Sequence, residues 1–272
     1  MVPNSESIPI WSLSGTDHIV QEINSKVHSD YVWLKILGEE QQEGVIQKLK
    51  YKPLKVIPIP EIFFDAFHPD MTYVQLNNGE LLESALGHYH SKISLWCYLN
   101  NVNLADTLKL FNGEIYARLG YLGKHHNSLL GLKNAISNCG LDVSPFQDVI
   151  SHADSFMHTF NHPKLSILAA IAESVCFKLQ VVPAVGHTEI PLVLRDALYE
   201  AGPIFPIYPE IADFYGLEGT YLSRRQDGRI LSLAEFNEES FQIYADVPNE
   251  QFNRESLFTE FFHKQMLETM GI

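Results

Sequence analysis

His68-Pro69-Asp70 places two titratable side chains at the end of FFDAFHPDMTY, residues 63–73, an aromatic-rich stretch that otherwise predicts a buried strand. In an extended segment, the side chains of residues i and i+2 point to the same side, so Asp70 can orient the imidazole of His68 or share a ligand with it. A neutral histidine is suited to taking a proton from a hydroxyl group near neutral pH. A turn whose polar groups satisfy one another fits the same residues, and the motif alone leaves both interpretations open.

Two further motifs place reactive groups at the ends of predicted elements. Ser14 lies in SLSGT, a strand-to-helix turn that can expose the serine hydroxyl and offer the N–H groups of Gly15 and Thr16 to an oxyanion or a phosphate. Asn161-His162-Pro163 repeats the His-Pro pattern at the start of a long predicted helix. Serine and asparagine are also ordinary helix caps. Together the three motifs contain a hydroxyl, a base, a carboxylate and amide donors, which are the parts of an acyl-transfer site.

Lys124, His125 and His126 form a compact cationic cluster in a chain whose charge is mainly acidic. The cluster fits either a solvated helix face or a phosphate clamp, to which Arg118 or Lys133 would contribute. Adjacent histidines do not share a helix face, so we expect no metal site here. The sequence also contains no GxGxxG or Walker-type loop, which argues against a dinucleotide-binding fold and a P-loop kinase.

Composition limits the partners and the compartment. The 272 residues include 33 acidic and 19 basic ones, for a formal charge of −14, and no dense basic patch, so we expect no nucleic-acid partner. The three cysteines follow no metal-binding spacing and favour a reducing compartment. The chain does not open on a basic segment followed by an apolar one, and its longest apolar stretch, 165–186, contains charged residues and a proline. We therefore expect neither a signal peptide nor a membrane span, and a cytoplasmic location.

The order of predicted elements favours a helix-rich α/β fold, in which helices cover a small parallel sheet in the N-terminal part. Strands at 8–13, 31–37 and 54–60 alternate with helices at 17–27 and 39–50. We expect one domain over 1–272, strand-rich at about 8–75 and helical at about 80–272. A further strand is predicted at 154–160, and the helices of the second part are predicted at 79–99, 103–111, 113–136, 145–153, 164–180, 189–200, 232–244 and 250–270.

Three segments, IPEIFFDAFHPDMTYV, FMHTFNHPKLSILAAIA and PIYPEIADFYGLEG, resemble in that order the WcbI-type polysaccharide biosynthesis family. The resemblance spans about residues 8–220 and implies an acetyltransferase of bacterial capsule assembly that binds coenzyme A. Members of that family usually open with a Gly-Asn-Cys-Gln turn after the first strand. Here Ser14 stands where the family has cysteine, which leaves open whether this position forms a covalent intermediate.

The resemblance and the motifs together predict a coenzyme A-dependent acyltransferase that acts on a sugar hydroxyl. His68 or His162 would act as the base, Asp70 would orient the imidazole, and Ser14 would either be acylated or serve through the N–H groups of its turn. The acyl donor is expected to contact Gly15, Thr16, Arg118, Lys124, His125, Asn161 and Lys164. Two alternatives remain: an SGNH-like serine esterase or deacetylase on carbohydrate, which uses the same parts with water as acceptor, and a non-catalytic glycan- or nucleotide-binding domain.

Overall fold

The structure is a computed structural model that describes residues 16–26, 32–35, 39–51, 55–151, 154–253 and 257–271. Near its start, the helices α1 (Thr16–Lys26) and α2 (Glu39–Lys48) alternate with the strands β1 (Val32–Lys35) and β2 (Lys55–Pro58). The two strands pair in parallel, with Val32 opposite Lys55. The predicted alternation is therefore confirmed for these elements, whereas the strand predicted at 8–13 lies outside the described residues.

The aromatic stretch after β2 is irregular and is not the buried strand that its composition predicts. Its backbone turns on itself, because the His68 N–H donates to the Asp65 carbonyl and the Met71 N–H donates to the His68 carbonyl, both at 3.1 Å. Regular pairing is limited to the short antiparallel strands β3 (Met71–Thr72) and β4 (His90–Ser91). The position of His68 is thus set by local turns rather than by a sheet.

The prediction of a helix at 79–99 is wrong for the first half of that range. Only α3 (Lys92–Leu99) is helical, and the Ser91 hydroxyl caps it by accepting a hydrogen bond from the Ser94 N–H at 3.0 Å. The preceding residues form tight turns, in which Gly79 and Gly87 have φ angles of 88° and 67°. Glycine adopts this left-handed region without the steric cost that other residues incur, so both positions interrupt the apolar periodicity that suggested a helix.

The remaining chain is mostly helical, as predicted, with some helices divided. The helix predicted at 113–136 breaks at Gly120, which has a φ of 72°. The helix predicted at 189–200 divides after Val193, and the strand predicted at 154–160 is reduced to a single bridge between Met157 and Pro163. The observed elements are α4 (Leu104–Lys109), α5 (Gly113–Arg118), the 3-10 helix η2 (Tyr121–Gly123), α6 (His125–Asn138), α7 (Ser144–Ser151), α8 (Leu165–Lys178), α9 (Ile190–Val193), α10 (Ala197–Ala201), α11 (Pro209–Tyr215), β5 (Ser223–Arg224), β6 (Ile230–Leu231), α12 (Leu233–Ala245), the 3-10 helix η3 (Asn249–Gln251) and α14 (Glu260–Met270).

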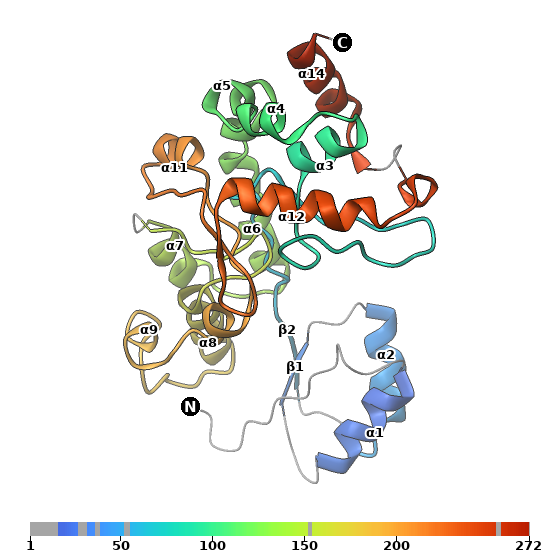
Figure 1. Ribbon diagram of the computed structural model, residues 1–272. Helices are drawn as coiled ribbons and strands as arrows, with labels where there is room; N and C mark the ends of the chain where they lie inside the picture. Colours follow the sequence, from blue (N-terminus) through green and yellow to red (C-terminus); the bar gives the residue numbers. More distant parts are fainter. Residues whose placement is uncertain are drawn as a thin grey trace.

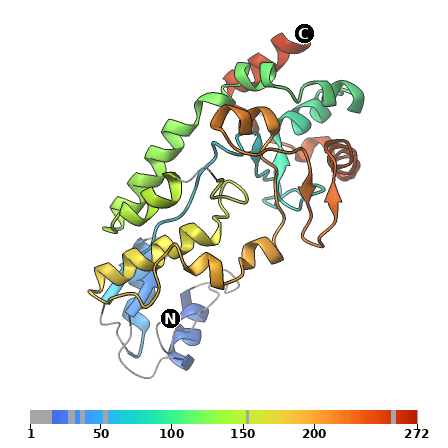
Figure 2. The same cartoon turned by 90° about the vertical axis from the view of Figure 1, so that its left-hand side faces the viewer.

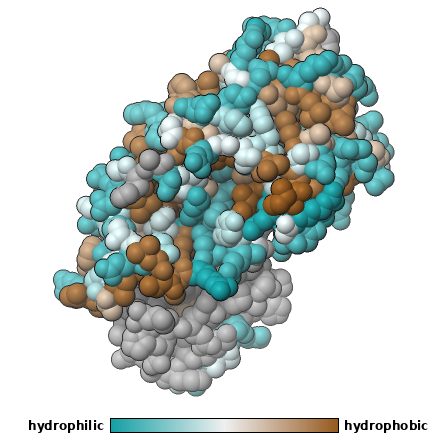
Figure 3. Space-filling model, turned by 60° about the vertical axis from the view of Figure 1, so that its left-hand side comes forward, coloured by the Kyte–Doolittle hydropathy of each residue, from teal (hydrophilic) through white to brown (hydrophobic). Residues whose placement is uncertain are grey.

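The parallel strand pair lies at one end of the molecule. Figures 1 and 2 show β1, β2, α1 and α2 at one end, and α4, α5 and α14 at the other, joined by the segment that follows β2. The main hydrophobic core lies in the helical part and contains fully buried Trp96, Tyr116 and Phe64. On the face shown in Figure 3, apolar residues lie in several patches between polar ones. The result is a helix-rich α/β fold, as the sequence predicted.

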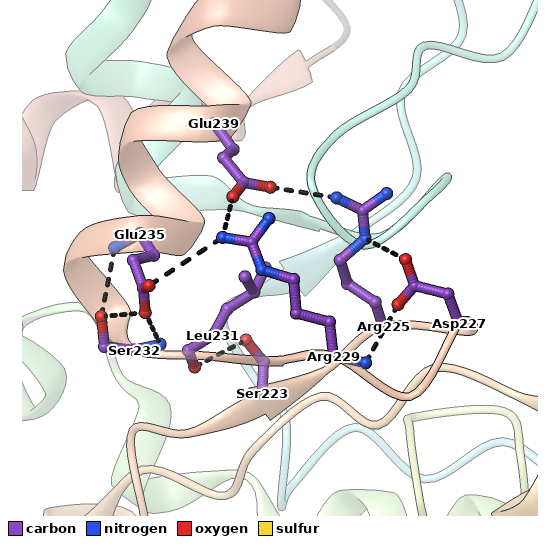
Figure 4. A network of polar contacts seen from close by, with 8 residues as sticks. All are labelled: Ser223, Arg225, Asp227, Arg229, Leu231, Ser232, Glu235 and Glu239. Atoms are coloured by element: carbon purple, nitrogen blue, oxygen red, sulfur yellow. Dashed lines mark hydrogen bonds and ion pairs between the residues drawn. The ribbon is translucent and has the colours of Figure 1, made fainter.

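A polar network holds the hairpin β5–β6 against the start of α12 (Figure 4). Glu239 accepts hydrogen bonds from Arg225 at 3.1 Å and pairs with Arg229 at 2.7 Å. Arg224 in β5 exchanges two backbone hydrogen bonds with Ile204, at 2.8 and 3.0 Å. Because residues 204–207 form a wall of the cavity described below, the hairpin and its ion pairs support that wall.

Candidate functional site

A cavity of about 540 Å³ lies between the turn at His68, the start of α8 and the two stretches that flank α11. A volume of this size is typical of small-molecule sites. The charged residues and histidines that line it are His68, Asp154, His158, Lys164, Asp196 and Glu218.

His68 lies on the cavity wall with an unsatisfied ring nitrogen. Its side chain is 2% exposed, and within the described residues Nδ1 has no hydrogen-bond partner. Burial lowers the pKa of His68 to about 3, against the opposing effect of a hydrogen bond to the backbone of Phe205. The ring is therefore neutral at physiological pH. Since buried polar atoms are nearly always paired in folded proteins, the unpaired Nδ1 is an exception that marks His68 as a candidate for a functional role.

A second histidine of the cavity, His158, is paired with a carboxylate. Its Nε2 lies 2.9 Å from Oδ2 of Asp196, and its side chain is 6% exposed. Burial lowers the pKa of His158, and Asp196 opposes that effect. A carboxylate that accepts a hydrogen bond from one imidazole nitrogen places the proton there and leaves the other nitrogen as the acceptor. Sequence reasoning did not select His158, although it lies four residues before His162 in the same segment.

The Asp196 carboxylate is itself held by backbone groups. Its Oδ2 accepts from the N–H of Leu165 at 2.9 Å, at the start of α8, and its Oδ1 accepts from the N–H of Tyr199 at 3.1 Å, in α10. Burial raises the pKa of Asp196, but the hydrogen bonds from His158, Leu165 and Tyr199 outweigh burial and leave that pKa below its usual value. Asp196 is therefore ionised at neutral pH and fixed in place on two helix starts.

Asp70 does not orient His68, so that part of the sequence-based prediction is wrong. The Asp70 carboxylate is completely buried and accepts hydrogen bonds from the hydroxyls of Tyr121 and Tyr208, both at 2.9 Å, and from the N–H of Ile93 at 3.1 Å. Pro69 separates the two residues in a turn and not in an extended strand, so the side chains do not share a side. Asp70 joins three elements of the core, and His68 faces the cavity.

Asn161 and His162 lie beside the cavity's histidines but do not line it. The His162 ring is within 3.3 Å of the Tyr89 hydroxyl, and the side-chain amide of Asn161 donates to the Tyr73 hydroxyl at 3.0 Å. The chain reverses between these residues, since the His158 N–H donates to the His162 carbonyl at 2.8 Å. The reversal puts His158 on the cavity and His162 against Tyr89.

The predicted phosphate clamp is not assembled among the described residues. Arg118 is paired with Glu114 on its own helix, at 2.7 Å. Lys124 is paired with Asp65 at 2.5 Å, and both line a different cavity of about 600 Å³. The His125 ring packs against Phe64 and Tyr215. Of the four cationic candidates, Lys164 alone lines the cavity that contains His68.

The other candidate ligands give a mixed outcome. Thr16 is the first residue of α1, whereas Ser14 and Gly15 lie outside the described residues. None of the three cysteines, Cys97, Cys139 and Cys176, is among the residues that line either cavity. The described residues contain no group of three or more potential metal ligands, and no described helix is long and apolar enough to cross a membrane.

Fold and site together define a helix-rich α/β protein with a cavity that contains a buried neutral histidine and a histidine–carboxylate pair. The chain belongs to the WcbI family: the model of that family, described as polysaccharide biosynthesis enzyme WcbI, matches residues 21–184, more than half of the chain. The matched range contains His68, His158 and Lys164, and it ends before Asp196.

One solved structure supports the same fold. The chain is similar to WcbI, described as a novel polysaccharide biosynthesis enzyme, with a TM-score of 0.59 and 14% identity over 96% of this chain and 88% of that one. That structure is of the native protein without a disulfide bond between coenzyme A and one of its cysteines. A comparison with curated proteins gave no match.

Proposed function

We propose that the protein is a coenzyme A-dependent acyltransferase that acts on a sugar hydroxyl in polysaccharide biosynthesis, with the His68 cavity as its active site. The proposal is carried by His68, a buried histidine that lines a cavity of suitable size and whose Nδ1 has no hydrogen-bond partner among the described residues. The coenzyme A named for the similar WcbI structure supports the choice of donor. Coenzyme A would supply an acyl group activated as a thioester.

The residues of the cavity fit the uncharged parts of both substrates better than the phosphates. Lys164 shares the lining of the cavity with three carboxylates, those of Asp154, Asp196 and Glu218. Such a lining repels the diphosphate of the donor, so we expect the cavity to hold the acyl end and the sugar hydroxyl. The N-terminal turn at Ser14–Thr16 remains our proposed site for an oxyanion or a phosphate.

A neutral imidazole on the cavity wall can accept a hydrogen bond from a hydroxyl group of the acceptor sugar and position that sugar for transfer. Of the two histidines that the sequence proposed as base, His68 lines the cavity and His162 does not. Because no cysteine lines the cavity, we propose direct transfer without a covalent acyl-cysteine. Ser14 then contributes the N–H groups of its turn.

Binding of the donor is tested by thermal unfolding with coenzyme A, acetyl-CoA and, as control, pantetheine without nucleotide. A ligand at about 100 times its dissociation constant stabilises by roughly 2.7 kcal/mol, which for a chain of this size raises the Tm by about 5–11 °C. An unchanged Tm at millimolar coenzyme A and acetyl-CoA would overturn the donor assignment.

The reaction class is tested by thiol release from acetyl-CoA with and without methyl glycosides as probe acceptors. Transfer requires the glycoside, an esterase-like activity releases thiol without it, and a binding domain releases none. His68→Ala is expected to lower turnover by up to about 10²-fold, because it removes the imidazole that positions the acceptor. The matched control is His88→Ala, because the His88 side chain is 46% exposed and does not line the cavity. A folded His68→Ala protein with activity within a few-fold of wild type would remove His68 from the site.

A further inference from the structure

The cavity contains two histidines with different surroundings, and one acceptor hydroxyl needs a single base. His68 has no carboxylate partner, and its unpaired nitrogen is Nδ1. His158 has Asp196 on Nε2 at 2.9 Å, and Asp196 is held by two backbone N–H groups that belong to different helices. A fixed carboxylate stabilises the imidazolium that forms when a histidine takes a proton, which is the arrangement of a base and its orienting group.

We propose that His158, held by Asp196, is the general base of the cavity, and that His68 orients the acceptor sugar by accepting a hydrogen bond from a second hydroxyl group of that sugar. This assignment rests on the proposed function. The O–H bond of the acceptor breaks and its proton goes to Nδ1 of His158. The acceptor oxygen forms the new ester bond to the acyl carbon, the bond from that carbon to sulfur breaks, and the proton leaves on the thiol. Asp196 is a positioning residue, since it acts through His158.

Charges around His158 favour this division of roles. Burial, Lys164 and Arg224 lower the pKa of His158 and Asp196 raises it, so that this pKa stays below its usual value. His68 has no such carboxylate, and burial lowers its pKa to about 3. The neighbouring His162 is held at a lowered pKa by its burial and is neutral near pH 7. A base is most effective when its pKa lies near the working pH, so a histidine with a carboxylate is better suited than His68. Because Asp196 is bound at Nε2, Nδ1 is the nitrogen of His158 that would accept the proton.

Glutamine at the two histidine positions separates a base from a hydrogen-bonding group. Glutamine keeps a hydrogen-bonding amide but cannot take a proton, so His158→Gln is expected to lower kcat for acetyl-CoA and methyl glycosides by about 10²–10⁴-fold. His68→Gln is expected to stay within about tenfold of wild type. Added imidazole is expected to restore part of the activity to His158→Ala and none to His68→Ala. The reverse order of the two glutamine variants would overturn the assignment.

Asp196→Asn separates positioning from structure. Asparagine caps helix starts as well as aspartate does, so a purely structural role predicts unchanged stability and an unchanged pH profile. If Asp196 positions the base, kcat falls by at least about 10²-fold and the acidic limb of the pH–rate profile moves to lower pH, because the carboxylate that raised the pKa of His158 is gone. Asp213→Asn, at an exposed position of α11, is the matched control. A full-activity Asp196→Asn protein with an unmoved limb would overturn the proposal.

A measurement without turnover tells failure of this assignment from failure of the proposed function. In long-range ¹H–¹⁵N spectra of the full chain, with His158→Gln to identify the signal, neutral His158 is expected to carry its proton on Nε2. Asp196→Asn is expected to weaken that preference. A proton on Nδ1 in wild type would overturn the dyad whatever the activity. Wild-type protein that releases no thiol would overturn the proposed function instead.

Discussion

Asp70→Ala tests whether this carboxylate belongs to the core or to the reaction. In the structure, it is the acceptor for the hydroxyls of Tyr121 and Tyr208 and for the N–H of Ile93. Alanine leaves these three buried donors without an acceptor, and each such loss costs about 1–3 kcal/mol. The free energy of unfolding is therefore expected to fall by about 3 kcal/mol or more, which corresponds to a Tm lower by at least about 6–12 °C.

The assay is urea unfolding followed by circular dichroism, with Asp70→Asn and the exposed Asp213→Ala beside it. Asparagine keeps one carbonyl oxygen as an acceptor, and a tyrosine hydroxyl can rotate to accept a hydrogen bond from the new NH₂ group. The free energy of unfolding of Asp70→Asn is therefore expected to fall by only about 1–2 kcal/mol. Asp213→Ala should stay within about 0.5 kcal/mol of wild type. If Asp70→Ala unfolds at the wild-type urea concentration but has lost thiol release, the core role assigned to Asp70 is refuted.

Three further changes have separate readouts. Burial lowers the pKa of His90 to about 4, which is below the value of about 6.5 in the unfolded chain. The contribution of neutral His90 to the free energy of unfolding is therefore complete above pH 6.5 and falls by about 1.4 kcal/mol per pH unit below it. Between pH 6.5 and 5, wild type should lose about 2 kcal/mol more than His90→Gln. A Cβ on Gly219 would come within 2.7 Å of the backbone of Pro209, so Gly219→Ala should lower the free energy of unfolding in urea by about 1–3 kcal/mol. A Cβ on Gly131, inside α6, would meet nothing within 4 Å, so Gly131→Ala should raise it by up to about 1 kcal/mol. Ser14→Ala should remain active, since alanine keeps the N–H groups of the turn, and an acyl adduct on Ser14 of wild type, seen by mass spectrometry, would contradict direct transfer.

Two helices were predicted closely. The helix predicted at 232–244 is α12 (Leu233–Ala245), where Ser232 and Glu235 form a capping box. The helix predicted at 164–180 is α8 (Leu165–Lys178). The segment 79–91 shows the opposite case: its apolar spacing fits a helix, but glycines at positive φ and contacts with distant elements decide for turns. One such contact is the Ser240 hydroxyl, which accepts from the Ala85 N–H at 3.3 Å.

The sequence by itself determined the helix-rich α/β class and the family likeness, because these depend on periodicity, composition and short motifs. Tertiary structure alone decided which carboxylate meets which histidine. Asp70, two residues from His68, belongs to a tyrosine cluster assembled from 93, 121 and 208. Asp196 lies 38 residues from His158 in the sequence. It reaches His158 because its carboxylate also bonds the first turns of α8 and α10, which lie side by side there. A hydrogen bond between side chains depends on where the backbone brings them, and sequence separation does not fix that distance.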